Sequence, residues 1–120
     1  MAAKDDLGRA GEERAARYLS GRGYEILDRN WRCPQGEIDI VAVDGRRLVV
    51  AEVKTRRSDR FGHPLEAVDR RKAQRLWRLA MAWIRAHPEQ ARGRMLRLDA
   101  IAIVGDDPAM GALEHVEVVP

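Results

Sequence analysis

The chain has 120 residues, 45% of them hydrophobic and 34% charged, and this composition predicts a single globular domain over residues 1–120 rather than a disordered chain. No apolar run approaches the ~18–20 residues that cross a bilayer, and the N-terminus lacks the apolar stretch of a signal peptide, so we expect a cytoplasmic protein without a membrane partner. The single cysteine, Cys33, excludes an internal disulfide, and three scattered histidines form no zinc cluster with it.

The net charge of +3 is distributed unevenly along the chain. Residues 1–54 carry ten basic and ten acidic side chains, residues 55–97 carry twelve and four, and residues 98–120 carry none and five. Of the 22 basic side chains 19 are arginine, which indicates either phosphate recognition by the guanidinium group or the codon bias of a GC-rich genome. Codon bias does not explain why the basic excess falls in the middle third.

Glycine and proline divide the first half of the chain into one helix and several extended segments. The predicted elements are a helix from about Asp6 to Ser20, a strand over Tyr24–Trp31, a loop over Arg32–Gly36, and a hairpin of Glu37–Asp44 with Arg47–Lys54. The hairpin turns around Asp44-Gly45-Arg46, since Asp-Gly and Gly-X favour tight turns between strands.

The second half returns from helix to strand. The predicted elements are a polar loop over Thr55–His63, a helix that begins at Pro64 or near Asp69 and ends at His87, and strands over Met95–Val104 and Leu113–Val119. The order α-β-β-β-α-β-β predicts an α/β fold with a mixed central sheet flanked by helices. We expect the acidic residues from Asp99 to Glu117 to keep exposed strand edges soluble.

The second helix is predicted to have one apolar and one cationic side. Its apolar stripe follows the i, i+3/i+4 rule and consists of Ala73, Leu76, Trp77, Ala80, Trp83 and Ile84. The opposite side carries Arg71, Arg75, Arg78 and Arg85. We expect both tryptophans in the core, whereas the arginines are either a solvated face or contacts to phosphate groups.

Acidic residues interrupt the apolar strands of the hairpin. Side chains alternate between the two faces of a strand, so the turn decides whether Asp39 and Glu52 share a face. A two-residue turn at Asp44-Gly45 or at Gly45-Arg46 keeps them together, and the second sets Asp39 directly opposite Glu52. A three-residue turn separates them. Because two-residue turns are favoured in hairpins, we expect a shared face.

Two carboxylates on one face repel each other unless a cation lies between them. Ligands that are all oxygen suit a hard ion such as Mg²⁺ or Mn²⁺, which makes Asp39 and Glu52 candidate metal ligands. Lys54 would point into the same site, where an ammonium group can hold the attacking water and offset negative charge in a transition state. The pattern indicates phosphodiester hydrolysis; the alternative is a surface ion pair between Glu52 and Lys54.

The first helix offers a third carboxylate, Glu12. The packing side of this helix is marked by Leu7, Gly11, Ala15, Tyr18 and Leu19. Glu12 lies at the edge of that stripe and is either a third ligand or a surface residue, whereas Glu13 projects away. Gly8 and Gly11 would let the helix backbone approach its neighbour closely.

The polar loop leaves the hairpin directly after Lys54, so its arginines would lie beside the metal. The candidate contacts to DNA phosphates are Arg56, Arg57 and Arg60 of the loop and Arg71, Arg75 and Arg78 of the second helix. Such contacts would bind DNA without sequence specificity. Phe61 and Trp31 are able to stack on unpaired bases, but we expect both to pack within the protein. His63 is either a proton donor to the leaving oxygen or an incidental loop residue.

Four linked segments carry a family resemblance: Gly8-Arg9-Ala10-Gly11-Glu12, Gly36-Glu37-Ile38-Asp39-Ile40-Val41-Ala42, Glu52-Val53-Lys54-Thr55-Arg56, and Phe61-Gly62-His63-Pro64-Leu65-Glu66-Ala67-Val68. Over roughly residues 5–100 the chain resembles the PD-(D/E)xK nuclease superfamily and, more closely, the small bacterial YraN-like family. The superfamily's Pro-Asp is Ile38-Asp39 here. Members are usually described as predicted endonucleases distantly related to archaeal Holliday junction resolvases.

The resemblance implies a restriction-endonuclease-like αβββαβ core. It further implies Glu12, Asp39 and Glu52 as metal ligands, Lys54 as the catalytic lysine, and Mg²⁺ or Mn²⁺ as cofactor. The implied activity is a DNA endonuclease selective for branched or junction DNA, acting as a homodimer like the related resolvases. The alternatives are a nucleic-acid-binding module that keeps the fold without turnover, and a protein-interaction domain.

Overall fold

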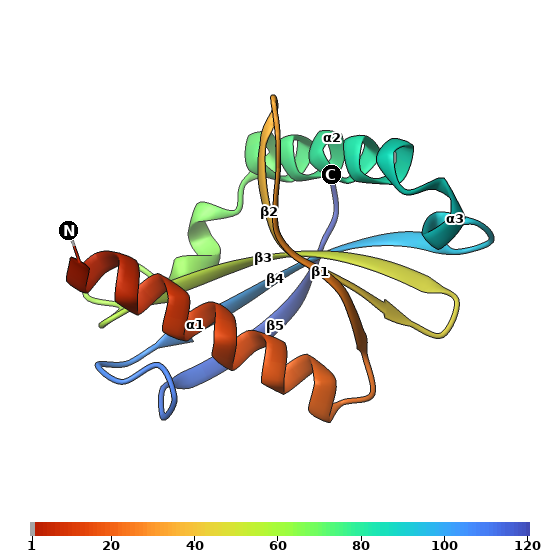
Figure 1. Cartoon of the computed structure of the whole chain (residues 1–120). Helices are drawn as coiled ribbons and strands as arrows, with labels where there is room; N and C mark the ends of the chain where they lie inside the picture. Colours follow the sequence, from red (N-terminus) through yellow and green to blue (C-terminus); the bar gives the residue numbers. More distant parts are fainter. Residues whose placement is uncertain (1) are drawn as a thin grey trace.

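The computed structural model describes residues 2–120, with only the backbone described for residues 2–5 and 67. Its elements in chain order are α1 (Ala2–Gly21), β1 (Glu25–Cys33), β2 (Gly36–Asp44), β3 (Arg47–Arg56), the 3₁₀ turn η1 (Pro64–Ala67), α2 (Arg70–Ala86), α3 (Pro88–Ala91), β4 (Met95–Val104) and β5 (Ala112–Val118). Figure 1 shows them along the colour-coded chain. None of the helices over residues 2–120 is long and apolar enough to span a membrane.

The five strands form one mixed sheet in the order β1-β2-β3-β4-β5. Neighbouring strands are antiparallel except β3 and β4, which are parallel and are joined through η1, α2 and α3. Two parallel strands need such a long crossover, whereas the antiparallel pairs need only short turns. The predicted α/β fold with a mixed sheet flanked by helices is confirmed, and it is compatible with a restriction-endonuclease-like core.

The two long helices cover opposite faces of the sheet (Figure 1). On the α1 side, Ala15 and Leu19 of the helix pack against Ile40, Ala51 and other buried residues of the strands. On the α2 side, the core is larger and consists of Ile38, Val41, Val43, Leu48, Val50, Ala73, Leu76, Leu79, Ala80, Trp83, Leu98, Ala100 and Val118. Side chains that alternate between the two faces of β2 and β3 therefore contribute to two separate apolar layers, one under each helix.

The β1–β2 hairpin leaves the plane of the sheet at its far end. The predicted loop over Arg32–Gly36 is too long, because Cys33 already pairs with Gly36 and only two residues turn the chain. Figure 1 shows this end rising toward α2. There, a Cβ placed on Gly36 would lie 2.7 Å from the Arg75 guanidinium. As β2 bends away, its pairing with β3 extends from the turn only to Ile40 opposite Ala51.

Of the two starts considered for the second helix, the one near Asp69 is confirmed, whereas the expectation that both tryptophans lie in the core is wrong for Trp77. Pro64 begins the separate turn η1, while α2 starts after Asp69, whose side chain caps the helix by accepting a hydrogen bond from the Lys72 N–H at 3.0 Å. Trp83 is fully buried as expected, but Trp77 is 45% exposed. Trp77 lies at the rim of the apolar stripe, where it lines a surface pocket with Pro120.

The expectation of exposed acidic strand edges is wrong for Asp99, which is fully buried in β4. Its carboxylate accepts hydrogen bonds from Arg97 at 2.8 and 2.6 Å and pairs with the His115 ring of β5. Burial alone would raise the pKa of Asp99, but the hydrogen bonds from His115 and Arg97 outweigh it and lower the pKa. Glu114 and Glu117 are exposed on the edge strand, as expected.

Candidate metal centre

The turn between β2 and β3 brings the two predicted acids together. Asp44 pairs with Arg47, so Gly45-Arg46 forms the two-residue turn, with Gly45 at a φ of 59°. The paired register ends at Ile40 opposite Ala51, and β2 bends away from β3 before Asp39 and Glu52 can pair. This is one of the two two-residue turns expected to keep Asp39 and Glu52 on one face, whereas a three-residue turn would have separated them.

The Asp39 carboxylate lies in the gap where β2 and β3 separate. Its Oδ2 atom accepts a hydrogen bond from the backbone N–H of Val53 at 2.7 Å. Because β2 bends away from β3 beyond Ile40, the Val53 N–H has no backbone partner on β2. The Asp39 carboxylate accepts this hydrogen bond instead.

Three carboxylates meet at this gap. One oxygen from each of Glu12, Glu37 and Asp39 lies within 4.8 Å of the others. Glu12 comes from α1 and is half-buried, and its role as a third ligand stays a prediction. Glu13 is exposed and pairs with Arg29 at 3.0 Å, as the helical wheel predicted for a residue projecting away.

A close approach of α1 to β3 sets the position of Glu12. A Cβ placed on the neighbouring Gly11 would lie 1.9 Å from Thr55 Oγ1, so only glycine fits there. The expectation is confirmed for Gly11 and is wrong for Gly8, where a Cβ would meet nothing within 4 Å.

Glu37 was not chosen as a ligand from the sequence, although it lies two residues before Asp39 and shares its side of the strand. Its Oε2 atom also accepts from Arg32 at 2.8 Å. Asn30 of β1 was missed as well. It has a positive φ of 54°, rare for a residue other than glycine, and its side chain lowers the pKa of Glu12 against the raising effect of burial. No sequence signal marks Asn30.

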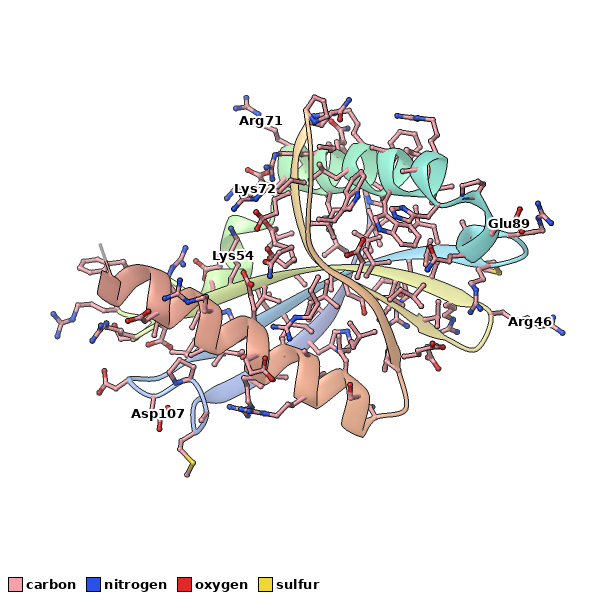
Figure 2. The ribbon with its side chains drawn as sticks, viewed as in Figure 1. Arg46, Lys54, Arg71, Lys72, Glu89 and Asp107 are labelled. Carbon is pink, nitrogen blue, oxygen red and sulfur yellow. The ribbon has the colours of Figure 1, made fainter. Side chains whose placement is uncertain are left out.

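Glu52 and Lys54 form an ion pair at the rim of the three carboxylates. The Lys54 Nζ atom lies 3.4 Å from Glu52 Oε1, and the side chains are only 21% and 18% exposed. Glu52 is not within the group of three carboxylates, but its charge acts on Asp39. Figure 2 shows Lys54 rising from β3 between α1 and the η1 turn. The ion pair is thus observed, and a ligand role for Glu52 stays a prediction.

The electrostatics of the site are those of crowded acids. Burial, together with the charges of Glu12, Glu52 and Glu37, raises the pKa of Asp39 to about 7, against the lowering effect of the Val53 hydrogen bond. Burial and the nearby Glu37 charge also raise the pKa of Glu12. An all-oxygen donor set with unneutralised charge fits a hard divalent cation such as Mg²⁺ or Mn²⁺.

The predicted DNA-contacting arginines fall in four places. Arg56, Arg57 and Arg60 are exposed in the segment that follows Lys54. Arg75 lies over Gly36, next to Glu37 in the chain. Arg71 lies at the start of α2, on the same side of the view as Lys54 (Figure 2). Arg78 instead lines the surface pocket with Trp77 and Pro120.

The aromatic and histidine expectations have mixed outcomes. Trp31 packs against the α2-side core, as expected. Phe61 does not pack: it is 95% exposed. His63 has a structural role, because its Nδ1 atom accepts from the Leu65 N–H at 3.1 Å and its Nε2 atom bonds Glu114 at 2.8 Å.

A search of known families matches residues 11–103 to the model described as "Uncharacterised protein family UPF0102". Close relatives carry the name "UPF0102 protein". The protein from Paenarthrobacter aurescens (strain TC1) is 53% identical over 116 residues, covering 97% of this chain and 94% of the relative. Those from Arthrobacter sp. (strain FB24) and Beutenbergia cavernae are 54% and 48% identical, each over 97% of both chains. The matched region contains all the carboxylates of the site.

Proposed function

The chain belongs to the UPF0102 family, the YraN-like family, and on this premise we propose that it is a metal-dependent endonuclease that hydrolyses phosphodiester bonds of DNA. The observation that carries the proposal is the convergence of Glu12, Glu37 and Asp39 within 4.8 Å, beside the Glu52–Lys54 pair. Three acids from α1 and β2 thus lie close together, and the Glu52 that acts on Asp39 is paired with Lys54 of β3.

Glu12, Glu37 and Asp39 would hold the cation, and Glu52 would join them if its side chain leaves Lys54. When bound, Mg²⁺ or Mn²⁺ acidifies a water molecule and neutralises charge on the phosphate. The pKa of Asp39, raised to about 7 by burial and by the charges of Glu12, Glu52 and Glu37, supports this assignment, because a bound cation would stabilise the ionised carboxylate against both effects.

The remaining chemistry is assigned to side chains of the chain itself. The Lys54 ammonium, held beside the carboxylates, would orient the attacking water and stabilise the negative charge that grows on the phosphate oxygens. Arg56, Arg57 and Arg60 would bind neighbouring phosphates without reading the bases. Branched DNA as the substrate and a homodimer as the active form are implied by the family resemblance and are part of the proposal.

Cleavage assays on defined DNA test this function. Purified protein is incubated with junction, flap and linear duplex DNA in Mn²⁺ and in EDTA, together with Asp39→Ala, Lys54→Ala and the control Glu13→Gln. We expect Mn²⁺-dependent cleavage that falls at least ~100-fold in the first two variants and is unchanged in the control.

The other outcomes separate the alternatives. Cleavage that survives both alanine substitutions would place the activity elsewhere or in a contaminant. Binding without cleavage under every condition would indicate a nucleic-acid-binding module, and absence of DNA binding in low salt would indicate a protein-interaction domain.

A further inference from the structure

Phe61 is the most exposed of the large hydrophobic residues that the structure describes, at 95%, and it is the one phenylalanine in the sequence. It lies between β3 and η1, in the segment that leaves the sheet after Lys54. An aromatic ring left in water forgoes the stabilisation that burial would give, so its exposure calls for a partner outside the chain.

The turn that carries Phe61 is fixed on its C-terminal side. The Gly62 N–H donates to the Asp59 carbonyl at 3.0 Å, and Gly62 has a φ of 105°, a conformation that favours glycine. His63 then ties the chain to Glu114 of β5 and caps η1 through Leu65. The ring is therefore held outward by bonded neighbours on an ordered turn.

The surroundings of Phe61 are cationic rather than apolar. Arg56, Arg57 and Arg60 are all exposed and precede it in the same segment, with Asp59 as the one acidic residue between Thr55 and Phe61. A docking surface for a protein gathers several apolar residues around its centre. A single aromatic among guanidinium groups is instead typical of surfaces that bind unpaired nucleotides, where phosphates contact the cations and a base stacks on the ring.

We propose that Phe61 stacks on an unpaired base of DNA whose phosphates contact Arg56, Arg57 and Arg60. This inference rests on the proposed function and adds a specificity-determining residue to it. The site then favours DNA with an unpaired nucleotide beside the cleaved phosphate, because a base inside a continuous duplex offers no free face to the ring.

Binding measurements without divalent cations test the inference separately from cleavage. The probes are a fluorescein-labelled single strand of about 20 nucleotides and the matched duplex, each titrated in EDTA at low salt. The variants are Phe61→Ala, Phe61→Leu and Phe61→Trp. Met110→Ala is the matched control, since Met110 is also exposed, at 83%, and lies between β4 and β5.

We expect Phe61→Ala to weaken single-strand binding about tenfold while duplex binding changes less than about twofold. Phe61→Trp should keep the affinity, Phe61→Leu should lose most of it, and Met110→Ala should change neither. Thermal unfolding of each variant checks that the fold is intact. We expect it to be intact, because the exposed Phe61 side chain contributes little to the core.

Equal losses on both DNA forms, full affinity in Phe61→Ala, or a wild-type chain that does not bind the single strand would each overturn the inference. Full affinity in Phe61→Leu would also overturn it, because an aliphatic contact, such as one with a protein partner, needs no aromatic ring. If the preference for single-stranded over duplex DNA depends on Phe61 but no DNA is cut, the proposed hydrolysis fails and the stacking role stands. If DNA is cut but this preference does not depend on Phe61, the stacking role fails and the proposed hydrolysis stands.

Discussion

The Asp39 carboxylate occupies the position of a missing backbone partner for Val53, accepting its N–H at 2.7 Å. This one contact explains how acids from different elements meet. It exists because β2 bends away from β3, and the same bend opens the gap that Glu12 reaches from α1. The geometry of the hairpin and the chemistry of the site therefore have a common origin.

Replacing Asp39 with asparagine should stabilise the metal-free protein at alkaline pH. The amide oxygen can still accept from Val53, and the negative charge that Glu12 and Glu52 repel is gone. Between pH about 4 and 7 the unfolded chain has lost the Asp39 proton while the folded chain keeps it, so wild-type stability falls as the pH rises through this range.

Urea unfolding in EDTA at pH 5 and pH 8 measures this effect. We expect Asp39→Asn to be more stable than the wild type by about 2 kcal/mol at pH 8 and nearly equal to it at pH 5. A variant that is less stable at both values would show that the carboxylate is not under repulsion.

Divalent cations should stabilise the wild type, and more so at alkaline pH. A ligand at 100 times its dissociation constant adds about 2.7 kcal/mol to the free energy of unfolding. Below pH 7, protons compete for Asp39, so the increase in melting temperature with Mn²⁺ should shrink between pH 8 and pH 5.5.

The variants Glu12→Gln and Asp39→Asn should reduce this increase, whereas Glu13→Gln, on the exposed side of α1, should retain it. Differential scanning fluorimetry with Mn²⁺ and Mg²⁺ gives the comparison. An increase that is identical in all these variants would place cation binding at another part of the chain.

Much of the fold followed from local patterns. Alternation along β2 and β3, the helical stripe of α2 and the turn at Gly45 each depend on residues close in sequence, and each was predicted. The bend of the β1–β2 hairpin was not, because its segment reads as a regular strand. That bend depends on packing of Ile38 and Trp31 against α2, which no local pattern contains.

The site was predicted as far as the hairpin reaches. The length of the turn was enough to predict that Asp39 and Glu52 share a face of the sheet. The helical wheel predicted which side of α1 carries Glu12, but not which strand residues it lies beside. Glu37 lies on the same side of β2 as Asp39 and joins the cluster, although it was not predicted as a ligand. Phe61 was expected to pack because aromatic residues are usually buried, and its exposure was visible only in three dimensions.

Replacing Asp99 with asparagine should destabilise the fold strongly. The fully buried carboxylate accepts two hydrogen bonds from Arg97 and one from His115, which joins β4 to β5. A neutral amide cannot accept both hydrogen bonds from the Arg97 guanidinium or balance its charge. We therefore expect the free energy of unfolding, measured in urea at pH 7, to fall by about 3–5 kcal/mol. Glu117→Gln, at the facing position of β5, should change stability by less than about 0.5 kcal/mol.

Asp99 and Asp39 affect the pH dependence of the free energy of unfolding in opposite directions. Because the pKa of Asp99 is lowered on folding, its contribution is complete above the unfolded value and is lost as the pH falls below about 4. The difference between wild type and variant should shrink there. A difference of less than about 1 kcal/mol at pH 7 would mean that the network does not hold β5 in place.

The two glycines of α1 should respond in opposite directions to alanine. At Gly11 a Cβ would collide with the Thr55 side chain, so Gly11→Ala should destabilise the protein by about 1–3 kcal/mol and push α1 away from β3. At Gly8 the space is open, and Gly8→Ala should stabilise the helix by about 0.5–1 kcal/mol.

The same pair separates stability from function. Glu12 follows Gly11 directly, so displacement of α1 would carry its carboxylate away from Asp39 and weaken Mn²⁺ binding, measured by calorimetry, even in the folded Gly11→Ala protein. Gly8→Ala should bind Mn²⁺ like the wild type. Because the clash involves Thr55 Oγ1 and Cγ2, adding Thr55→Ala to Gly11→Ala should restore part of both properties. Unchanged Mn²⁺ affinity in the single Gly11→Ala variant would show that Glu12 does not contribute to the metal centre.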